Sequence, residues 1–321
     1  LSEHSWTDAA DVETDLAVLP VGSTEQHGPH APLGTDAVTA DAIAAGGVDR
    51  YDGEAVLGPT IPVGVAAEHR QFPGTLWVSE DTFRDYVRET VSSLASHGWR
   101  RVVVVNGHGG NVNPLRELCG TLVRETDTYA VPFTWFDAAA FDNLEADIRM
   151  GHGGPAETSL LQHVAPDLVD ADRLDAAGEG AADRWGEWQS GGNLAYDSAE
   201  FSENGVVGDP RDGSSEVGEQ LYESATTALA AAQHLLVPVQ TEFLALKGLD
   251  RMLHTLQMVM KSQKNDLSYT IIPTMYDRRT QASVQSLNQL RKSYGKELWR
   301  FAIPVDTRFR DASQKGVVPS A

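Results

Sequence analysis

The chain has 321 residues, with 46 Asp and Glu against 25 Lys and Arg, a formal charge of −21 and a single cysteine. Its length predicts one large or two medium domains, and 41% hydrophobic residues are enough to bury a sizeable core. One cysteine, Cys119, excludes a disulfide framework, a cysteine-rich zinc module and an iron–sulfur cluster. No apolar run approaches the roughly 18–20 residues that span a bilayer, and residues 1–4 show no secretory signal pattern. We therefore expect a cytoplasmic protein without a membrane partner.

The charge is unevenly distributed along the chain. Residues 1–236 contain 12 Arg, no Lys and 39 Asp and Glu, whereas residues 237–321 contain 13 Lys and Arg and 7 Asp and Glu. A lysine-free surface dense in carboxylates is typical of a halophilic protein, and it argues against a nucleic-acid partner because phosphate contacts need Lys and Arg. The change in composition predicts two pieces, a domain over residues 1–236 and a second segment over residues 237–321.

Strands and helices alternate in the first piece. In chain order, the apolar patterns predict a buried strand at 16–21, a shorter one at 55–59, a helix at 80–97, a buried strand at 101–105, a helix at 114–125 and a strand at 129–133. This alternation predicts a mainly parallel sheet with helices on both faces. Binding sites of such folds form at the carboxyl ends of the strands, which is where the polar clusters of this sequence lie.

Three of these clusters combine histidine with carboxylates or with a glycine-rich backbone. They are Glu25 and His27 followed by Asp36, then His108 in the loop Asn106–Asn111, and then His152 with Glu157. Mixed His, Asp and Glu ligation without cysteine suits Zn²⁺, Mn²⁺ or Fe²⁺ in a hydrolytic site. With enough carboxylates, one of them can bridge two ions about 3.5–4 Å apart.

Taken one at a time, the same residues also fit structural roles. His108 suits a helix cap, and His152 with Glu157 suits a surface ion pair. His30 is a candidate to support His27, and His69 is a candidate to line a pocket. Cys119 is expected to be an inert packing residue, and no Gly-x-Ser-x-Gly motif is present for a serine nucleophile.

Together, five sequence blocks resemble the signature blocks of the creatininase family, in the same order along the chain. The blocks are Val21–His30, Leu33–Asp36, Phe72–Thr75, Asn106–Asn111 and His152–Ser159, within a resemblance that covers about residues 5–230. The resemblance implies a three-layer α/β/α domain with a mainly parallel sheet. It also implies a homo-oligomer, usually a hexamer, that acts as a two-metal amidohydrolase on a small-molecule amide.

The resemblance implies specific roles for the clustered residues. The metal ligands would be Glu25, His27, Asp36 and His108, with Asp36 bridging two divalent ions (Zn, Fe or Mn). Creatinine-cleaving members carry a Glu two residues after the loop histidine, whereas this chain has Gly110, so we expect Glu157 to supply the missing carboxylate ligand. His152 would be the catalytic general acid/base while a metal-bound hydroxide attacks a non-peptide C–N amide or formamide carbon.

The family includes several activities, and the sequence ranks them. The halophilic composition favours a formylaminopyrimidine ribotide deformylase of archaeal type. A mycofactocin-type peptidase and a creatinine-like cyclic amidase are the alternatives, and Gly110 weakens the second of these. Trp185 and Trp188 are candidates either to line a substrate pocket or to pack their own loop.

The last segment has a different character. Strands are predicted at 235–240, 269–274 and 301–306, with helical patterns at 244–260 and 280–294. Residues 233–321 resemble the C-terminal part of ParA/MinD-type partition ATPases, but the chain lacks the phosphate-binding GxxxxGK[ST] motif. We expect a partial α/β fragment of a P-loop ATPase-like fold, appended or chimeric, that has no activity and is able to block the hexamer. The missing motif disfavours the alternative function of a nucleotide- or DNA-binding partition protein.

Overall fold

A computed structural model describes the chain except residues 145–147, 232–234, 243–244, 250–251, 254–268 and 304–321. It divides into two compact units, Leu1–Ala231 and Ala232–Ala321. Each unit is described separately below.

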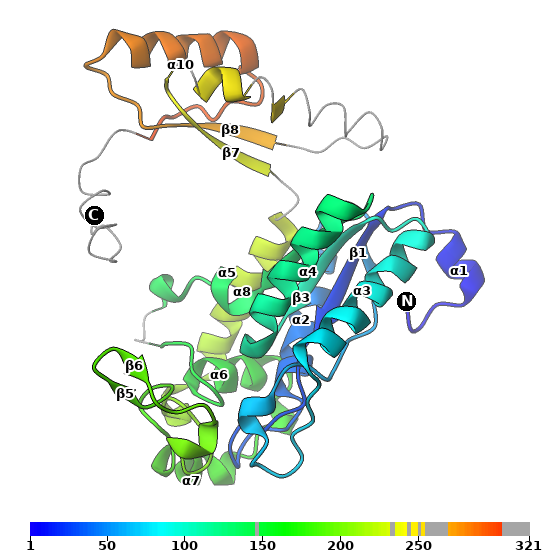
Figure 1. Cartoon of the computed structure of the whole chain (residues 1–321), viewed down its shortest axis with the longest axis vertical. Coiled ribbons are helices and arrows are strands. Elements are labelled where there is room, and N and C mark those ends of the chain that lie inside the picture. The colour runs from blue at the N-terminus through cyan, green and yellow to red at the C-terminus, as the bar shows by residue number, and fades with distance from the viewer. Residues whose placement is uncertain (145–147, 232–234, 243–244, 250–251, 254–268, 304–321) are drawn as a thin grey trace. The chain divides into compact units, whose positions relative to one another are not determined.

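The centre of the first unit is a parallel sheet in the order β2-β1-β3-β4. Figure 1 labels its two central strands, β1 and β3. Its strands are β1 (Leu16–Val21), β2 (Val56–Leu57), β3 (Arg101–Asn106) and β4 (Tyr129–Thr134). The predicted strands are confirmed, although β2 is shorter than its apolar pattern indicates. Parallel neighbours need crossover connections, and helices supply them between successive strands.

The first unit contains helices that the sequence pattern predicts and others that it does not. Their bounds are α1 (Trp6–Ala10), α2 (Thr35–Arg50), α3 (Glu80–Ser96), α4 (Val112–Glu125), α5 (Trp135–Ala138), α6 (Pro155–Val164), α7 (Leu174–Glu179) and α8 (Ser215–Ala231). The predicted helices at 80–97 and 114–125 are confirmed as α3 and α4. The Ser79 hydroxyl caps α3 by accepting the Thr82 backbone N–H at 3.2 Å, and Gly98, with φ of 105°, follows its end. A short hairpin, β5 (Trp188–Gln189) with β6 (Gly192–Asn193), completes the unit.

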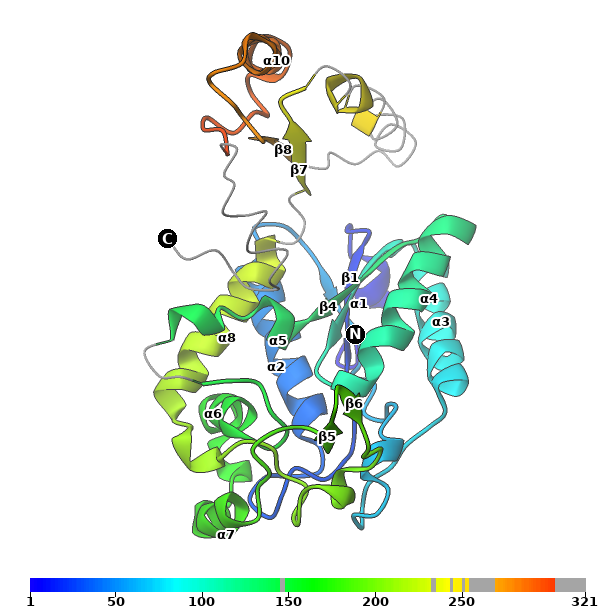
Figure 2. The same cartoon turned by 60° about the vertical axis from the view of Figure 1, so that its left-hand side comes forward.

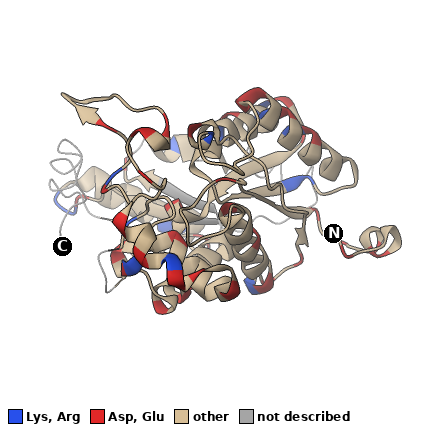
Figure 3. Ribbon diagram, turned by 90° about the horizontal axis from the view of Figure 1, so that it is seen from below, with Lys and Arg blue, Asp and Glu red and all other residues tan. Residues whose placement is uncertain are grey.

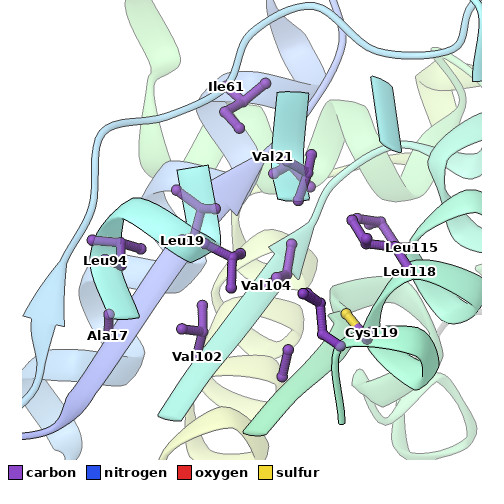
Figure 4. Packing of buried hydrophobic residues seen from close by; sticks show 14 of the residues in the cluster. Ala17, Leu19, Val21, Ile61, Leu94, Val102, Val104, Leu115, Leu118 and Cys119 are labelled. Carbon is purple, nitrogen blue, oxygen red and sulfur yellow. The ribbon is translucent and has the colours of Figure 1, made fainter. Parts of the chain in front are cut away.

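Two apolar cores lie on opposite faces of the sheet. Strand side chains alternate between faces, so Leu19 and Val104 pack with α3 and α4 (Figure 4), whereas Val18 and Val105 pack with α2, α6 and α8. Figure 2 shows the two sets of helices on either side of the strands. The predicted three-layer α/β/α architecture is therefore confirmed. Cys119 is buried in the first core, as its role as a packing residue requires.

The second unit contains a parallel pair, β7 (Leu235–Gln240) with β8 (Tyr269–Thr274), and the helix α10 (Gln281–Tyr294). These three elements match the predicted segments 235–240, 269–274 and 280–294. Residues 301–303 are not a strand, and the rest of the predicted strand 301–306 lies outside the described residues. Of the pattern at 244–260, residues 245–249 are helical, and most of the remainder also lies outside the described part. Buried Leu246, Ile271 and Leu290 belong to a separate small core.

Acidic residues recur along the helices in view (Figure 3). Within the ranges that the structure describes, no helix combines the length and apolar character that crossing a bilayer requires.

Candidate functional site

The predicted site residues converge at the carboxyl ends of β1 and β3. These strands are parallel neighbours in register, with Val21 opposite Asn106, so the loops that follow them leave the same edge of the sheet. Glu25 and His27 lie in the loop after β1, and His108 lies directly after β3.

Two helices supply the remaining candidates. Asp36 lies in the first turn of α2, and Glu157 lies in the first turn of α6, whose Pro155 starts the helix. His152 precedes α6, and an isolated bridge holds it opposite Val207. The structure thus brings all six predicted residues into one buried cluster.

Three histidines of this cluster direct one ring nitrogen inward. In each case the other ring nitrogen donates to a backbone carbonyl: His27 Nδ1 to Glu25 at 3.1 Å, His108 Nε2 to Val65 at 2.6 Å and His152 Nε2 to Gln26 at 2.5 Å. Backbone carbonyls that fix the ring in this way are typical of metal-binding histidines. The inward nitrogens are therefore placed to hold a proton or a metal ion.

Asp36 lies between two of these inward nitrogens. Its Oδ1 is 3.1 Å from His27 Nε2, and its Oδ2 is 3.2 Å from His108 Nδ1. A carboxylate whose two oxygens face different ligands is arranged as a bridging ligand would be.

The carboxylate of Glu25 is fully buried, and the described residues do not satisfy it. Neither of its oxygens, nor Oδ2 of Asp36, receives a well-aligned hydrogen bond from the part of the chain that the structure describes. His108 Nδ1 is 3.1 Å from Glu25 Oε1, and Nδ1 of His152 is 3.6 Å from the same atom. Buried carboxylate oxygens are costly when they lack well-aligned donors, and a divalent cation would add the interaction that the shared contact with His108 does not fully supply. The donor set therefore fits a metal centre.

Burial and neighbouring charges shift the pKa values of the residues in the cluster. Burial lowers the pKa of His27, but Asp36, Glu157 and Glu25 outweigh it and raise that pKa to about 10. For His108 the neighbouring carboxylates likewise overcome burial and raise its pKa well above the ordinary value. Burial raises the pKa of Glu25 and also that of Glu157, the latter to about 7. Without metal, protons thus occupy the inward nitrogens of His27 and His108.

The pKa of His152 shifts in the opposite direction to those of His27 and His108. Burial and then the positive charge of His27 hold its pKa well below the ordinary value, so the ring is neutral. Because Nε2 donates to the Gln26 carbonyl, Nδ1 is the free acceptor. Glu157 accepts the Gly153 backbone N–H at 2.6 Å and lies 3.7 Å from His27 Nε2.

A pocket of about 350 Å³ opens onto the cluster. Its lining combines Asp36, His108, His152 and Glu157 with Phe136, Met150 and Trp185. Trp185 lies edge-on to His69 and His152, with ring centroids 5.6 and 6.1 Å away, whereas Trp188 is half exposed on β5 and is not part of the lining. Of the two predicted pocket tryptophans, Trp185 is therefore the one at the site.

Gly110 also lines the pocket, and its position leaves no room for a side chain. A Cβ there would lie 2.1 Å from the Val65 carbonyl oxygen and 2.5 Å from His108 Nε2. The nearest carboxylate beyond these atoms is that of Glu68, 3.2 Å from the same point. The backbone at Val65 thus occupies the space in which a ligand at position 110 would begin.

His69 is closer to the centre of the site than its sequence position predicted. His69 is fully buried, with Nε2 3.5 Å from Glu25 Oε1 and its ring stacked on His152 at 4.1 Å. Its position just before the Phe72–Thr75 block suggested a pocket wall but not contact with Glu25. His30 lies behind the site, where its Nε2 is 2.8 Å from Thr158 Oγ1.

Comparisons with known proteins identify the family of residues 2–233. The family described as "Creatininase: Creatinine amidohydrolase" matches residues 2–233. The mycofactocin precursor peptide peptidase of Mycolicibacterium smegmatis is 36% identical over 221 residues, which are 67% of this chain and 83% of that protein. A solved structure titled "Creatininase Mn" has a TM-score of 0.60 at 26% identity and covers 72% of this chain and 96% of its own.

The C-terminal segment matches a different group of proteins. The sporulation initiation inhibitor protein Soj of Bacillus subtilis is 32% identical over 90 residues, or 28% of this chain and 36% of Soj. The chain therefore spans about a third of the length of that relative, and the likeness to partition proteins is partial. Over residues 2–233, the fold, the cluster and the family match agree: the chain belongs to the creatininase family.

Proposed function

We propose that the first unit is a metal-dependent amidohydrolase that cleaves a C–N amide bond in a peptide substrate. One observation carries the metal dependence: three histidines direct a nitrogen at carboxylates whose buried oxygens lack well-aligned partners among the described residues. The residues that would hold the ions are Glu25, His27, Asp36, His108 and Glu157.

The residues of the chain divide the work of amide hydrolysis. Bound divalent ions would polarise the scissile carbonyl and acidify a water molecule. His152 Nδ1, neutral and free to accept, takes the proton that the water loses and returns it to the leaving nitrogen. Trp185 and Phe136 line the apolar part of the pocket beside these groups.

Similarity to known proteins supports a peptide as the first candidate substrate. The relative named as a peptidase is 36% identical over 83% of its length, whereas the creatinine amidohydrolase of Pseudomonas putida is 31% identical over 68% of its length. Gly110 supports the same order, since creatinine-cleaving members carry a glutamate there. We therefore rank the formylaminopyrimidine ribotide, preferred on composition, second to a peptide.

The assay compares three amides with the full chain loaded with Zn²⁺, Mn²⁺ or Fe²⁺. They are a library of peptides with varied C-terminal residues, a formylaminopyrimidine ribotide and creatinine. We expect peptide cleavage that disappears in His152→Ala and persists in the matched control His97→Ala, an exposed histidine at the end of α3. Turnover of the formamide or of creatinine without peptide cleavage would overturn the substrate assignment. No turnover of any amide by the metal-loaded chain would overturn the proposed function.

For the second unit we propose no separate activity. Its described part has a two-stranded parallel sheet, and the chain carries no GxxxxGK[ST] motif for nucleotide phosphates. We expect ATP to bind neither the full chain nor this segment, which equilibrium dialysis with labelled ATP tests. Stoichiometric ATP binding would contradict the proposal.

A further inference from the structure

The side-chain amide of Gln26 has one possible orientation. Its Oε1 accepts the Gly28 backbone N–H at 2.9 Å, so this atom must be the oxygen. Its Nε2 donates to the Gly205 carbonyl at 3.0 Å, so this atom must be the nitrogen. Gly205 has φ of 81°, and a Cβ on it would lie 2.2 Å from the Gln26 amide, so only glycine lets that carbonyl come so close.

This orientation determines where His69 carries its proton. Gln26 Nε2 lies 2.8 Å from His69 Nδ1, and an amide nitrogen can only donate. The ring nitrogen Nδ1 is therefore the acceptor, and the proton is on Nε2. Ser198 Oγ, 3.0 Å from the same Nδ1, has the Glu68 carbonyl at 3.2 Å as an acceptor for its own hydrogen.

His69 thus differs from the three other histidines in the cluster in which side of its ring donates a hydrogen bond. His27, His108 and His152 donate to backbone carbonyls and turn the second nitrogen inward. His69 accepts on its outer side and presents an N–H toward Glu25 Oε1, 3.5 Å away. To bind a cation through Nε2, His69 would have to move that proton to Nδ1, which faces the amide N–H of Gln26. The position of His69 near Glu25 and His152 would otherwise suit a ligand.

We propose that His69 is a positioning residue of the metal centre, not a ligand: it donates Nε2–H toward the Glu25 carboxylate in a tautomer set by Gln26. The inference rests on the proposed function, since it requires Glu25 to bind metal. Stacking on His152, with 22° between the ring planes, restricts rotation of the imidazole. One Glu25 oxygen is then oriented by His69, and the carboxylate keeps a fixed direction toward the ion.

Zinc binding by the full chain tests the assignment, with zinc alone as the probe and a chromophoric chelator as competitor. We expect His69→Ala to keep the wild-type zinc stoichiometry at saturation while its affinity falls about 10- to 100-fold. His69→Gln places an amide N–H₂ near the position of Nε2 and should recover most of that loss. A stoichiometry that falls as far as in His108→Ala, or an affinity that His69→Ala leaves unchanged, would overturn the inference.

Cobalt(II) absorption provides a second readout. Gln26→Glu replaces the amide donor by an acceptor, which moves the proton of His69 to Nδ1 and exposes the Nε2 lone pair to the ion. We expect Gln26→Glu to alter the cobalt spectrum, and we expect the wild-type spectrum to return when His69→Gln is added. If the altered spectrum of Gln26→Glu is still present in the double variant, the inference is contradicted. If circular dichroism shows that Gln26→Glu does not fold, the His69 variants decide. A wild type that binds no zinc would instead overturn the proposed function itself.

Discussion

Nδ1 of His108 lies 3.1 Å from Oε1 of Glu25, although the two residues follow different strands of the sheet. The contact exists because β1 and β3 are adjacent and parallel, so their carboxyl ends deliver a histidine and a carboxylate to one buried point. The apolar faces of the two strands build the cores, and their ends build the site.

Glu25→Gln should weaken metal binding and raise the stability of the metal-free protein. Burial disfavours the charged carboxylate, so the neutral amide should stabilise the metal-free protein by about 1–3 kcal/mol while weakening metal binding. Thermal unfolding with and without zinc measures both effects. Exposed Glu89→Gln on α3 is the matched control and should change neither. A variant that is less stable than wild type without metal yet keeps the full zinc-induced stabilisation would contradict the account.

Gly110→Glu should fail to restore the pattern of the creatinine-cleaving members. Even a Cβ at this position meets the Val65 carbonyl at 2.1 Å, so Gly110→Ala should already destabilise the chain by about 1–3 kcal/mol. Gly109→Ala is the control, because among the described residues no atom lies within 4 Å of its added Cβ. Denaturant unfolding of the three variants decides the matter. Equal stability of Gly110→Ala and Gly109→Ala would show that the loop can move away.

Metal binding at pH 7 should release protons. In the metal-free protein the pKa of His27 is raised to about 10, so its inward nitrogen is protonated at neutral pH and must lose that proton to bind metal. Zinc affinity should therefore increase as the pH rises from 7 to 9. Calorimetry in buffers of different ionisation enthalpy measures the release directly. Zinc binding without proton release, at an affinity independent of pH, would be incompatible with the site described.

Cys119 should resist alkylation in the native protein. Burial raises the pKa of its thiol to about 12, and the side chain is 2% exposed, so both the thiolate and access to it are scarce. Iodoacetamide labelling at pH 8, followed by mass spectrometry, should be slow in buffer and fast in denaturant. Because Cys119 is the single cysteine, any label reports this site alone. Complete labelling of the folded chain within minutes would contradict the packing of α4 against the sheet.

Much of this architecture could be predicted because the spacing of apolar residues and the local composition indicate the strands and helices. Val102–Val105 is a run of β-branched residues that suits a buried strand, and α3 repeats its apolar positions at helical spacing. Helices α2, α6 and α8 were not predicted. Their apolar stripes are weak, because alanine, glycine and threonine pack them closely against one another.

The site was predictable in part for a related reason. Residues that bear chemistry stand in short motifs, so Glu25, His27 and His108 could be chosen from the sequence. The role of His69 could not be chosen this way, because it depends on the amide of Gln26 and on the carbonyl of Gly205, which the fold alone brings together.

The metal content of the purified full chain decides whether the buried cluster of histidines and carboxylates is a metal centre. Elemental analysis after loading and dialysis in high salt compares the wild type with His108→Ala, using His97→Ala as the control. We expect about two equivalents of Zn, Mn or Fe in the wild type and in the control, and a clear loss in His108→Ala. A folded wild type that retains no metal, or a His108→Ala variant that retains as much as the wild type, would contradict this expectation.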